Sequence, residues 1–138
     1  MLTEEQKKSA ERLTRYIERE RLVSVMNDTK WRRLLEALAP IQGVLEFRRK
    51  EVGQDESQLE SWNSDIYYMM AGWRSIEWLD ISAQRSFRRG VLLAPEINDQ
   101  TSLLLQTVRV ADVPFSRQEY GIRIWGYLRP GVTPDWVK

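Results

Sequence analysis

Apolar residues in the first forty positions recur at helical spacing, and each of two such segments starts at residues that can cap a helix. Thr3 and Gln6 have the spacing of a capping box, which begins a helix that we expect to end near residues 20–22. A second helix is expected from residues 27–29 until Pro40 interrupts it. The apolar faces of the two helices consist of Ala10, Leu13, Tyr16 and Ile17, and of Trp31, Leu34, Leu35 and Leu38.

The last third of the chain predicts one more helix and then a strand. Asp99 or Thr101 can cap a helix that ends before Pro114, with Leu104, Leu105, Val108 and Ala111 on one side. Residues 121–130 alternate strictly between two kinds of side chain, which is typical of a strand with one buried face. The buried face would carry Ile122, Ile124, Gly126 and Leu128, and the other face would carry Arg123, Trp125, Tyr127 and Arg129.

The middle of the chain favours short strands. Residues 44–52 place Leu45 and Phe47 two positions apart, and residues 53–63 are polar and acidic, as in a loop. The segments rich in β-branched and aromatic residues are short enough to be strands; they are 66–70 and 76–81, with a further candidate at 90–93.

Two helices, several strands, a helix and a strand, in this order, argue for the α+β class rather than for alternating α/β. We expect a single globular domain over residues 1–138, with two N-terminal helices, a mainly antiparallel sheet and one further helix before the terminal strand. The residues expected to be buried are Trp31, Leu34, Leu35, Leu38, Ile122, Ile124 and Leu128.

The composition narrows the possible functions mainly because two residue types are absent. The chain has no histidine and no cysteine, so it has no imidazole base, thiol nucleophile, disulfide or cysteine-ligated metal. It has no EF-hand spacing and no glycine-rich phosphate loop, and we expect no cofactor and no metal. No apolar stretch is long enough to cross a membrane, and the polar N-terminus does not resemble a signal peptide. We expect a small soluble protein of the cytoplasm that does not act at a membrane.

Charge is distributed unevenly although the total is only +1. Residues 51–80 carry one basic and seven acidic residues, a net charge of −6, between flanking segments of +4 and +3. Such runs are usually solvated faces. The alternative is an acidic patch with basic borders, which suits a protein partner better than a nucleic acid.

Asn27, Thr29, Lys30 and Trp31 form the densest local group of candidate binding residues. Helix caps at this position account for the polar residues, and Trp31 then begins the core. The functional alternative is an anion site, because a helix N-terminus favours negative charge and Lys30 is a cation in the first turn. Asp28 beside them would disfavour a doubly charged anion.

The segments 24–31 and 122–127 together resemble a family of small uncharacterised proteins that carry an Asn-x-Thr-Lys-Trp motif, the family of unknown function DUF6678. The resemblance implies a single domain of bacterial type and supplies no activity. Within it, the motif positions Asn27, Thr29, Lys30 and Trp31 are the first to test.

The strand face formed by Arg123, Trp125, Tyr127 and Arg129 is the second candidate. Arginines between aromatic rings on a sheet are one way of holding single-stranded nucleic acid. The same pattern fits packing inside the fold, or an anchor in a protein interface. We expect the functional surface to combine this strand with the start of the second helix.

Asp65, Glu77 and Asp80 lie among aromatic residues, as the carboxylates of glycosidases do. Carboxylates also occur by chance in an acidic segment, and we do not expect an enzyme. The sequence favours a non-catalytic domain that binds another protein, of which an immunity or inhibitor protein would be one kind. The alternative is a module that binds single-stranded RNA or DNA through the arginine and aromatic face.

Overall fold

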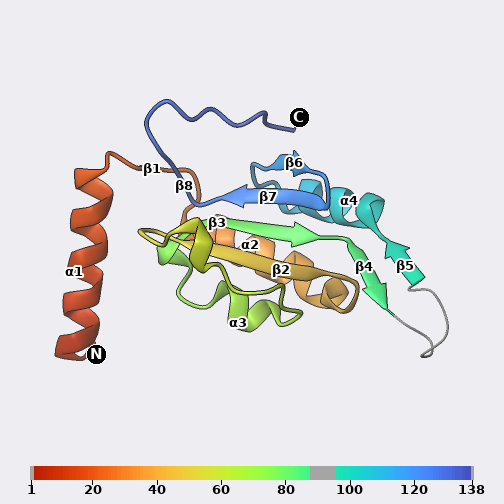
Figure 1. The fold of residues 1–138 in the computed structure, drawn as a ribbon, viewed down its shortest axis with the longest axis horizontal. Helices are drawn as coiled ribbons and strands as arrows, with labels where there is room; N and C mark the ends of the chain where they lie inside the picture. The colour runs from red at the N-terminus through yellow and green to blue at the C-terminus, as the bar shows by residue number, and fades with distance from the viewer. Residues whose placement is uncertain (1, 88–95, 138) are drawn as a thin grey trace.

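The computed structural model describes residues 2–87 and 96–137 and has the predicted α+β class (Figure 1). The helices are α1 (Glu4–Arg19), α2 (Asp28–Leu38), α3 (Ile66–Met70) and α4 (Thr101–Ala111), with short 3₁₀ helices η1 (Ala39–Val44), η2 (Glu56–Gln58) and η3 (Trp73–Ser75). The strands are β1 (Val23–Ser24), β2 (Glu46–Glu51), β3 (Ile76–Ser82), β4 (Gln84–Phe87), β5 (Glu96–Asp99), β6 (Ser116–Gln118), β7 (Gly121–Trp125) and β8 (Tyr127–Leu128).

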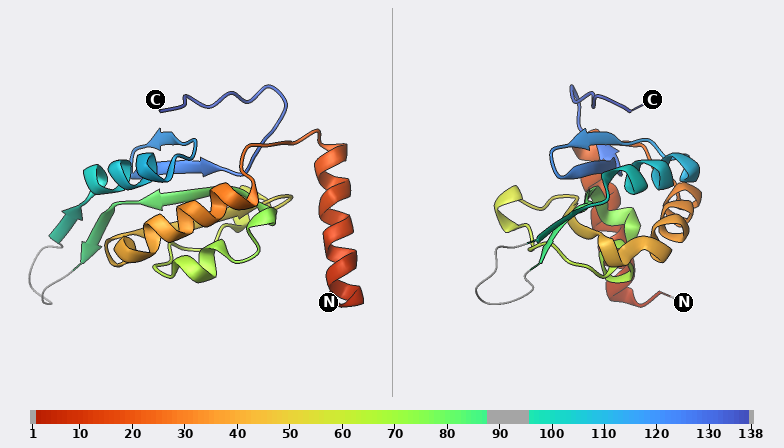
Figure 2. Two further views of the ribbon diagram at one scale, coloured as in Figure 1. Left: turned by 180° about the vertical axis from the view of Figure 1, so that it is seen from behind. Right: turned by 90° about the vertical axis from the view of Figure 1, so that its right-hand side faces the viewer.

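The main sheet has four antiparallel strands in the order β2-β3-β7-β6, and α2 and α4 cover one of its faces (Figures 1 and 2). Every residue of β3, the strand between β2 and β7, is buried. On the helix side, Ile81 lies between Phe47 and Ile122, and these side chains belong to the core. On the opposite side, at the next position along β3, lies a charged residue, Asp80.

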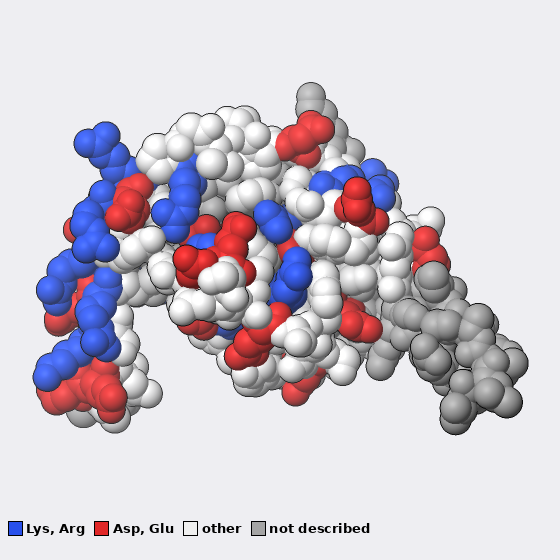
Figure 3. All heavy atoms as spheres, in the orientation of Figure 1, with Lys and Arg blue, Asp and Glu red and all other residues white. Residues whose placement is uncertain are grey.

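The helix α1 begins as predicted, because Thr3 and Gln6 form the reciprocal hydrogen bonds of a capping box. The helix stands beside the rest of the molecule, and an open notch separates its N-terminal half from the body (Figures 2 and 3). None of its residues is fully buried. The strand β1 pairs with β8 and leads the chain from α1 to α2.

The start of α2 is confirmed, since the Asn27 side chain accepts a hydrogen bond from the Lys30 backbone at 2.8 Å. Trp31, Leu34 and Leu38 are buried as expected. Leu35 is only half-buried, which corrects the expectation for this residue. Leu35 lies at the edge of the apolar face of α2, beside a surface hollow next to η3.

The expectation of a strand at residues 66–70 was wrong, because this segment forms α3. Asp65 is the reason: its carboxylate accepts hydrogen bonds from the backbone N–H groups of Tyr67 and Tyr68 and so starts a helix. The buried residues Ile66, Met69 and Met70 also have the helical spacing i, i+3, i+4 rather than the alternation of a strand.

The terminal strand is confirmed over residues 121–125, but it does not continue unbroken to residue 130. Gly126 interrupts it, and the chain then joins β1 in a second, two-stranded sheet. The alternation of faces breaks with it, so Tyr127 is buried and Leu128 is half-buried, which corrects the expectation that Leu128 lies in the core. A Cβ at position 126 would collide with the carbonyl oxygen of Ile76, so the glycine permits this close crossing.

Three further strand pairings were not predicted: β1 with β8, β4 with β5, and β6 with β7, the last of which is a hairpin closed by a turn at Glu119 and Tyr120. The candidate strand at residues 90–93 lies outside the described residues. The N-cap of α4 is Gln100 rather than Asp99 or Thr101, and it makes no side-chain capping bond. Asp99 lies one residue before the cap and accepts hydrogen bonds from both the backbone and the hydroxyl of Thr101. Among the described residues, no helix is long and apolar enough to span a bilayer.

Candidate functional site

The two segments that the sequence singled out meet at one cleft of about 440 Å³. We call it the α1–α2 cleft, because it opens between the end of α1, the start of α2, η3 and the segment that enters β8. Its lining residues are Ile17, Ser24, Met26, Asn27, Asp28, Trp31, Trp73, Arg74, Gly126 and Tyr127. The structure thus brings Asn27 and Trp31 together with Tyr127, although about a hundred positions separate them in the chain.

Hydrogen bonds between distant parts of the chain fix the walls of the cleft. The Tyr127 hydroxyl donates to the backbone carbonyl of Arg74 at 2.7 Å, and the Trp73 indole donates to the Asp28 carboxylate at 2.8 Å. The Arg74 guanidinium in turn donates to the Thr14 hydroxyl of α1 at 2.8 Å. Burial raises the pKa of Tyr127, so its hydroxyl remains a donor throughout the physiological range. The cleft is therefore a preformed feature of the fold.

Lys30 does not occupy the cleft. Its ammonium group approaches the Val25 carbonyl at 3.4 Å, and within residues 2–87 and 96–137 it forms no ion pair with any carboxylate. Thr29 is exposed and does not line the cleft. The cation at the cleft is Arg74, which sequence reasoning missed because it lies more than forty positions from the start of α2.

Arg123 and Trp125 lie on the opposite side of the main sheet from α2, since Ile122 and Ile124 take the helix side of β7. Arg123 binds the Asp80 carboxylate through two hydrogen bonds, of 2.7 and 3.1 Å, and its guanidinium lies 3.9 Å from the centre of the Trp78 ring. Burial acts to lower the pKa of Arg123, but the hydrogen bond and charge of Asp80 outweigh it and raise the pKa. Arg123 is therefore a neutralised part of the sheet rather than a free cation.

Arg129, which follows β8, is likewise held by a buried carboxylate of β3. It donates to Glu77 at 2.7 Å and to the Tyr16 hydroxyl at 3.1 Å, and the hydrogen bond to Glu77 is the main reason that the pKa of Arg129 is raised. Lys50 reaches the same carboxylate at 3.1 Å. Each buried carboxylate of β3, Glu77 and Asp80, thus has two cationic neighbours.

These contacts leave the acidic residues poorly suited to acid–base chemistry. Glu77 and Asp80 are buried and paired with cations, and Asp65 caps α3. The part of the chain that the structure describes has no group of three acidic side chains arranged to hold a metal ion. The geometry supports binding at the α1–α2 cleft and a structural role for the charged side of the sheet.

Comparison with protein families supports the resemblance carried by the two segments. Residues 13–131 match the model of a family of unknown function, DUF6678. The chain belongs to the DUF6678 family. The match begins within α1 and includes the whole α1–α2 cleft. No curated protein and no solved structure shows significant similarity to this DUF6678 member.

Proposed function

We propose that this DUF6678 protein is a recognition module that binds another protein, one with a basic surface, through the face formed by α3. The observation that carries the proposal is a pair of consecutive tyrosines on α3, Tyr67 and Tyr68, which are 59% and 56% exposed. Tyrosine is enriched where protein interfaces are anchored, because it combines apolar area with a polar hydroxyl at a small entropic cost.

Each tyrosine borders a separate hollow, so the surface around α3 has concave sites as well as exposed apolar area. The acidic hollow, about 330 Å³, is lined by Arg49, Glu51, Gln54, Glu60, Tyr68, Met69 and Ala71. The apolar hollow, about 340 Å³, is lined by Leu35, Tyr67, Met70, Ala71, Gly72, Trp73 and Arg74. Pockets of this kind beside aromatic residues receive the anchoring side chains of a partner.

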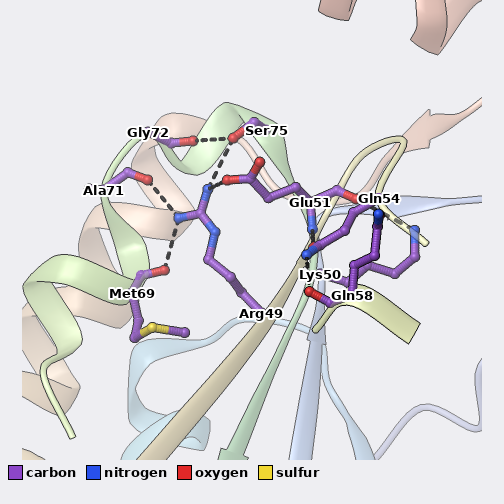
Figure 4. A network of polar contacts seen from close by, with 9 residues as sticks. All are labelled: Arg49, Lys50, Glu51, Gln54, Gln58, Met69, Ala71, Gly72 and Ser75. Carbon is purple, nitrogen blue, oxygen red and sulfur yellow. Dashed lines mark hydrogen bonds and ion pairs between the residues drawn. The ribbon is translucent and has the colours of Figure 1, made fainter. Parts of the chain in front are cut away.

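The short helix that carries the tyrosines is held rigidly. Arg49 reaches from β2 to the end of α3 and donates to the carbonyls of Met69 and Ala71 at 3.0 and 2.7 Å (Figure 4). The same guanidinium donates to Glu51 at 2.7 Å and to Ser75 at 3.1 Å. A surface held in this way needs little ordering on binding, which favours affinity.

Charge indicates the kind of partner. No lysine or arginine occurs between Lys50 and Arg74, whereas five acidic residues do: Glu51, Asp55, Glu56, Glu60 and Asp65. Figure 3 shows acidic side chains over the loop after β2 and beside α3, whereas basic and acidic side chains are mixed along α1. This potential complements a basic protein surface and repels the phosphates of a nucleic acid. An immunity or inhibitor protein would be one case, in which the basic partner is an enzyme.

The test is selective retention of a partner from a lysate of the native host on immobilised protein. We expect one protein to be retained by the wild type and by Val110→Ala, a control at an 80% exposed residue of α4, and to be lost from Tyr67→Ala and Tyr68→Ala. Glu60→Gln should weaken the retention, and so should salt. Equal retention by the tyrosine variants would overturn the proposal, as would salt-sensitive retention of nucleic acid alone.

A further inference from the structure

We propose that the α1–α2 cleft is a binding site for a small organic acid, namely an aromatic ring that carries one carboxylate. The proposal concerns a different surface from the tyrosine face of α3. It rests on three properties of the cleft: its apolar walls, the buried indole of Trp31 and the charge of Arg74.

The volume and walls of the cleft suit a flat apolar group. About 440 Å³ lies within the range of roughly 300–1,000 Å³ that is usual for small-molecule sites. Two indoles, Trp31 and Trp73, line it together with the phenol ring of Tyr127. Aromatic rings prefer to pack against such walls edge to face or with an offset.

Trp31 supplies an unused hydrogen-bond donor. The residue is only 3% exposed, and within the described part of the chain its indole N–H has no acceptor. Trp73 and Trp125 differ in this respect, since they donate to Asp28 and to Ser116. The nitrogen itself is not sealed, because Arg48 Nε is the buried side-chain atom that lacks a partner among the described residues, so the Trp31 N–H keeps access to solvent and can reach a bound molecule. The cleft is the hollow that the Trp31 ring lines, so an oxygen atom of a bound molecule would complete the bonding of this ring.

Arg74 supplies the uncompensated charge. Its guanidinium is exposed and donates to the Thr14 hydroxyl, and among residues 2–87 and 96–137 it has no carboxylate partner. Asp28, the acidic residue of the cleft, is stabilised by the Trp73 indole and by its place in the first turn of α2. A carboxylate would therefore gain a charge-assisted hydrogen bond from Arg74.

Asp28 also restricts the charge of the ligand. A dianion such as a phosphate monoester would be repelled by its carboxylate, whereas a single carboxylate needs only one cation. A cationic ligand would be repelled by the guanidinium of Arg74, which has the same charge. The combination of two indoles, one free arginine and one compensated aspartate selects a monoanion with an apolar body.

Phenylacetate is the probe, with phenylacetamide and phenethylamine as its neutral and cationic counterparts. Binding is followed by NMR through the indole N–H signals, and Trp31→Phe assigns the signal of Trp31. We expect phenylacetate to shift this signal saturably with a Kd at or below about 1 mM. Phenylacetamide should bind about tenfold more weakly, and phenethylamine should not saturate. An acetylated peptide that ends in phenylalanine is a second acid, and it distinguishes a free acid from the terminus of a peptide.

Two variants decide the role of Arg74. Arg74→Gln should weaken phenylacetate binding about tenfold and leave phenylacetamide binding unchanged, whereas Arg109→Gln, at an exposed arginine of α4, should change neither. The indole spectrum itself shows whether each variant is folded. Tyr68→Ala should bind phenylacetate like the wild type, because Tyr68 does not line this cleft, so failure here and failure of the α3 interface are distinguishable. The proposal is overturned if neither acid saturates the Trp31 signal, or if Arg74→Gln weakens the acid and the amide equally.

Discussion

Asp80 on β3 lies directly opposite Arg123 on β7, and the guanidinium of Arg123 holds its carboxylate through two hydrogen bonds. Asp80 is fully buried, and Arg48 approaches it from β2 at 3.5 Å. Three neighbouring strands of the sheet, β2, β3 and β7, are thus joined by charge on one side and by apolar packing on the other. The removal of one partner from such a pair leaves an uncompensated buried charge.

Asp80→Asn should therefore lower the free energy of unfolding by about 3–5 kcal/mol, because Arg123 and Arg48 lose their counter-charge while they remain partly buried. Urea denaturation followed by tryptophan fluorescence measures the change. Glu56→Gln, at an exposed position of η2, is the control and should stay within about 0.5 kcal/mol of the wild type. A wild-type urea midpoint for Asp80→Asn would show that the buried pair contributes nothing to stability.

Leu34→Ala and Leu35→Ala form a matched pair on α2. Leu34 is fully buried, so its truncation should cost about 2–5 kcal/mol through lost burial and a residual cavity. Leu35 borders the apolar hollow and is half-buried, so the same change should cost clearly less. Urea midpoints of the two variants give the comparison. Equal losses at both positions would mean that Leu35 is packed as tightly as Leu34.

Gly126→Ala should destabilise the protein strongly, by more than the roughly 1 kcal/mol typical of a point substitution. The added methyl group would meet the Ile76 carbonyl oxygen. The backbone N–H of Gly126 also donates to the backbone carbonyl of Glu77 at 2.8 Å, so the two segments cannot easily move apart. Gly43→Ala is the control, because apart from its own chain neighbours nothing lies within 4 Å of the Cβ it would add. Thermal unfolding of both variants tests this, and similar Tm values would refute the close crossing at Gly126.

Tyr120 should make stability depend on pH in the alkaline range. Burial, together with the hydrogen bond and charge of Asp80, raises the pKa of Tyr120 to about 12 from an ordinary value of about 10. Between these values the unfolded chain releases the phenolic proton while the folded chain retains it, so stability falls as pH rises above about 10. Below that pH the stabilisation is fully present.

Tyr120→Phe cannot ionise and should lose less stability than the wild type when the pH is raised from about 9 to about 11. Urea midpoints at the two pH values measure the difference. Tyr67→Phe is the control, since it removes the same hydroxyl group from an exposed position. Parallel pH dependence in Tyr120→Phe and the wild type would contradict the raised pKa.

The elements that depend on near neighbours could be predicted from the amino-acid sequence alone. The starts of α1 and α2 were predicted correctly because Thr3 and Asn27 bond to backbone groups only three residues away. The absence of histidine and cysteine likewise excludes whole classes of catalysis without any structure. The alternation of β7 was equally local, since it needs only one buried face.

Much of the remaining fold, and most of the candidate site, depend on contacts between residues that are far apart in the chain. Ile66–Met70 is rich in residues that favour strands, and the local helix signals, the Asp65 cap and the helical spacing of the buried residues, were overlooked. The tertiary contribution is the contact of Arg49 of β2 with the end of this helix. The terminal strand is interrupted at Gly126, where the chain passes close to the carbonyl oxygen of Ile76. That oxygen lies where the Cβ of any other residue would be, so the need for glycine at this position depends on a distant contact.

The arginines of the strand face looked like free cations in the sequence, and only the fold revealed the buried carboxylates of β3 that neutralise them. Arg74 had no distinguishing pattern and reached the α1–α2 cleft through η3. The physical reason is the same in each case. Hydrogen bonds across three or four residues can be predicted from residues that are close together in the sequence. Charge pairing and steric exclusion depend instead on residues that become neighbours only after the chain has folded.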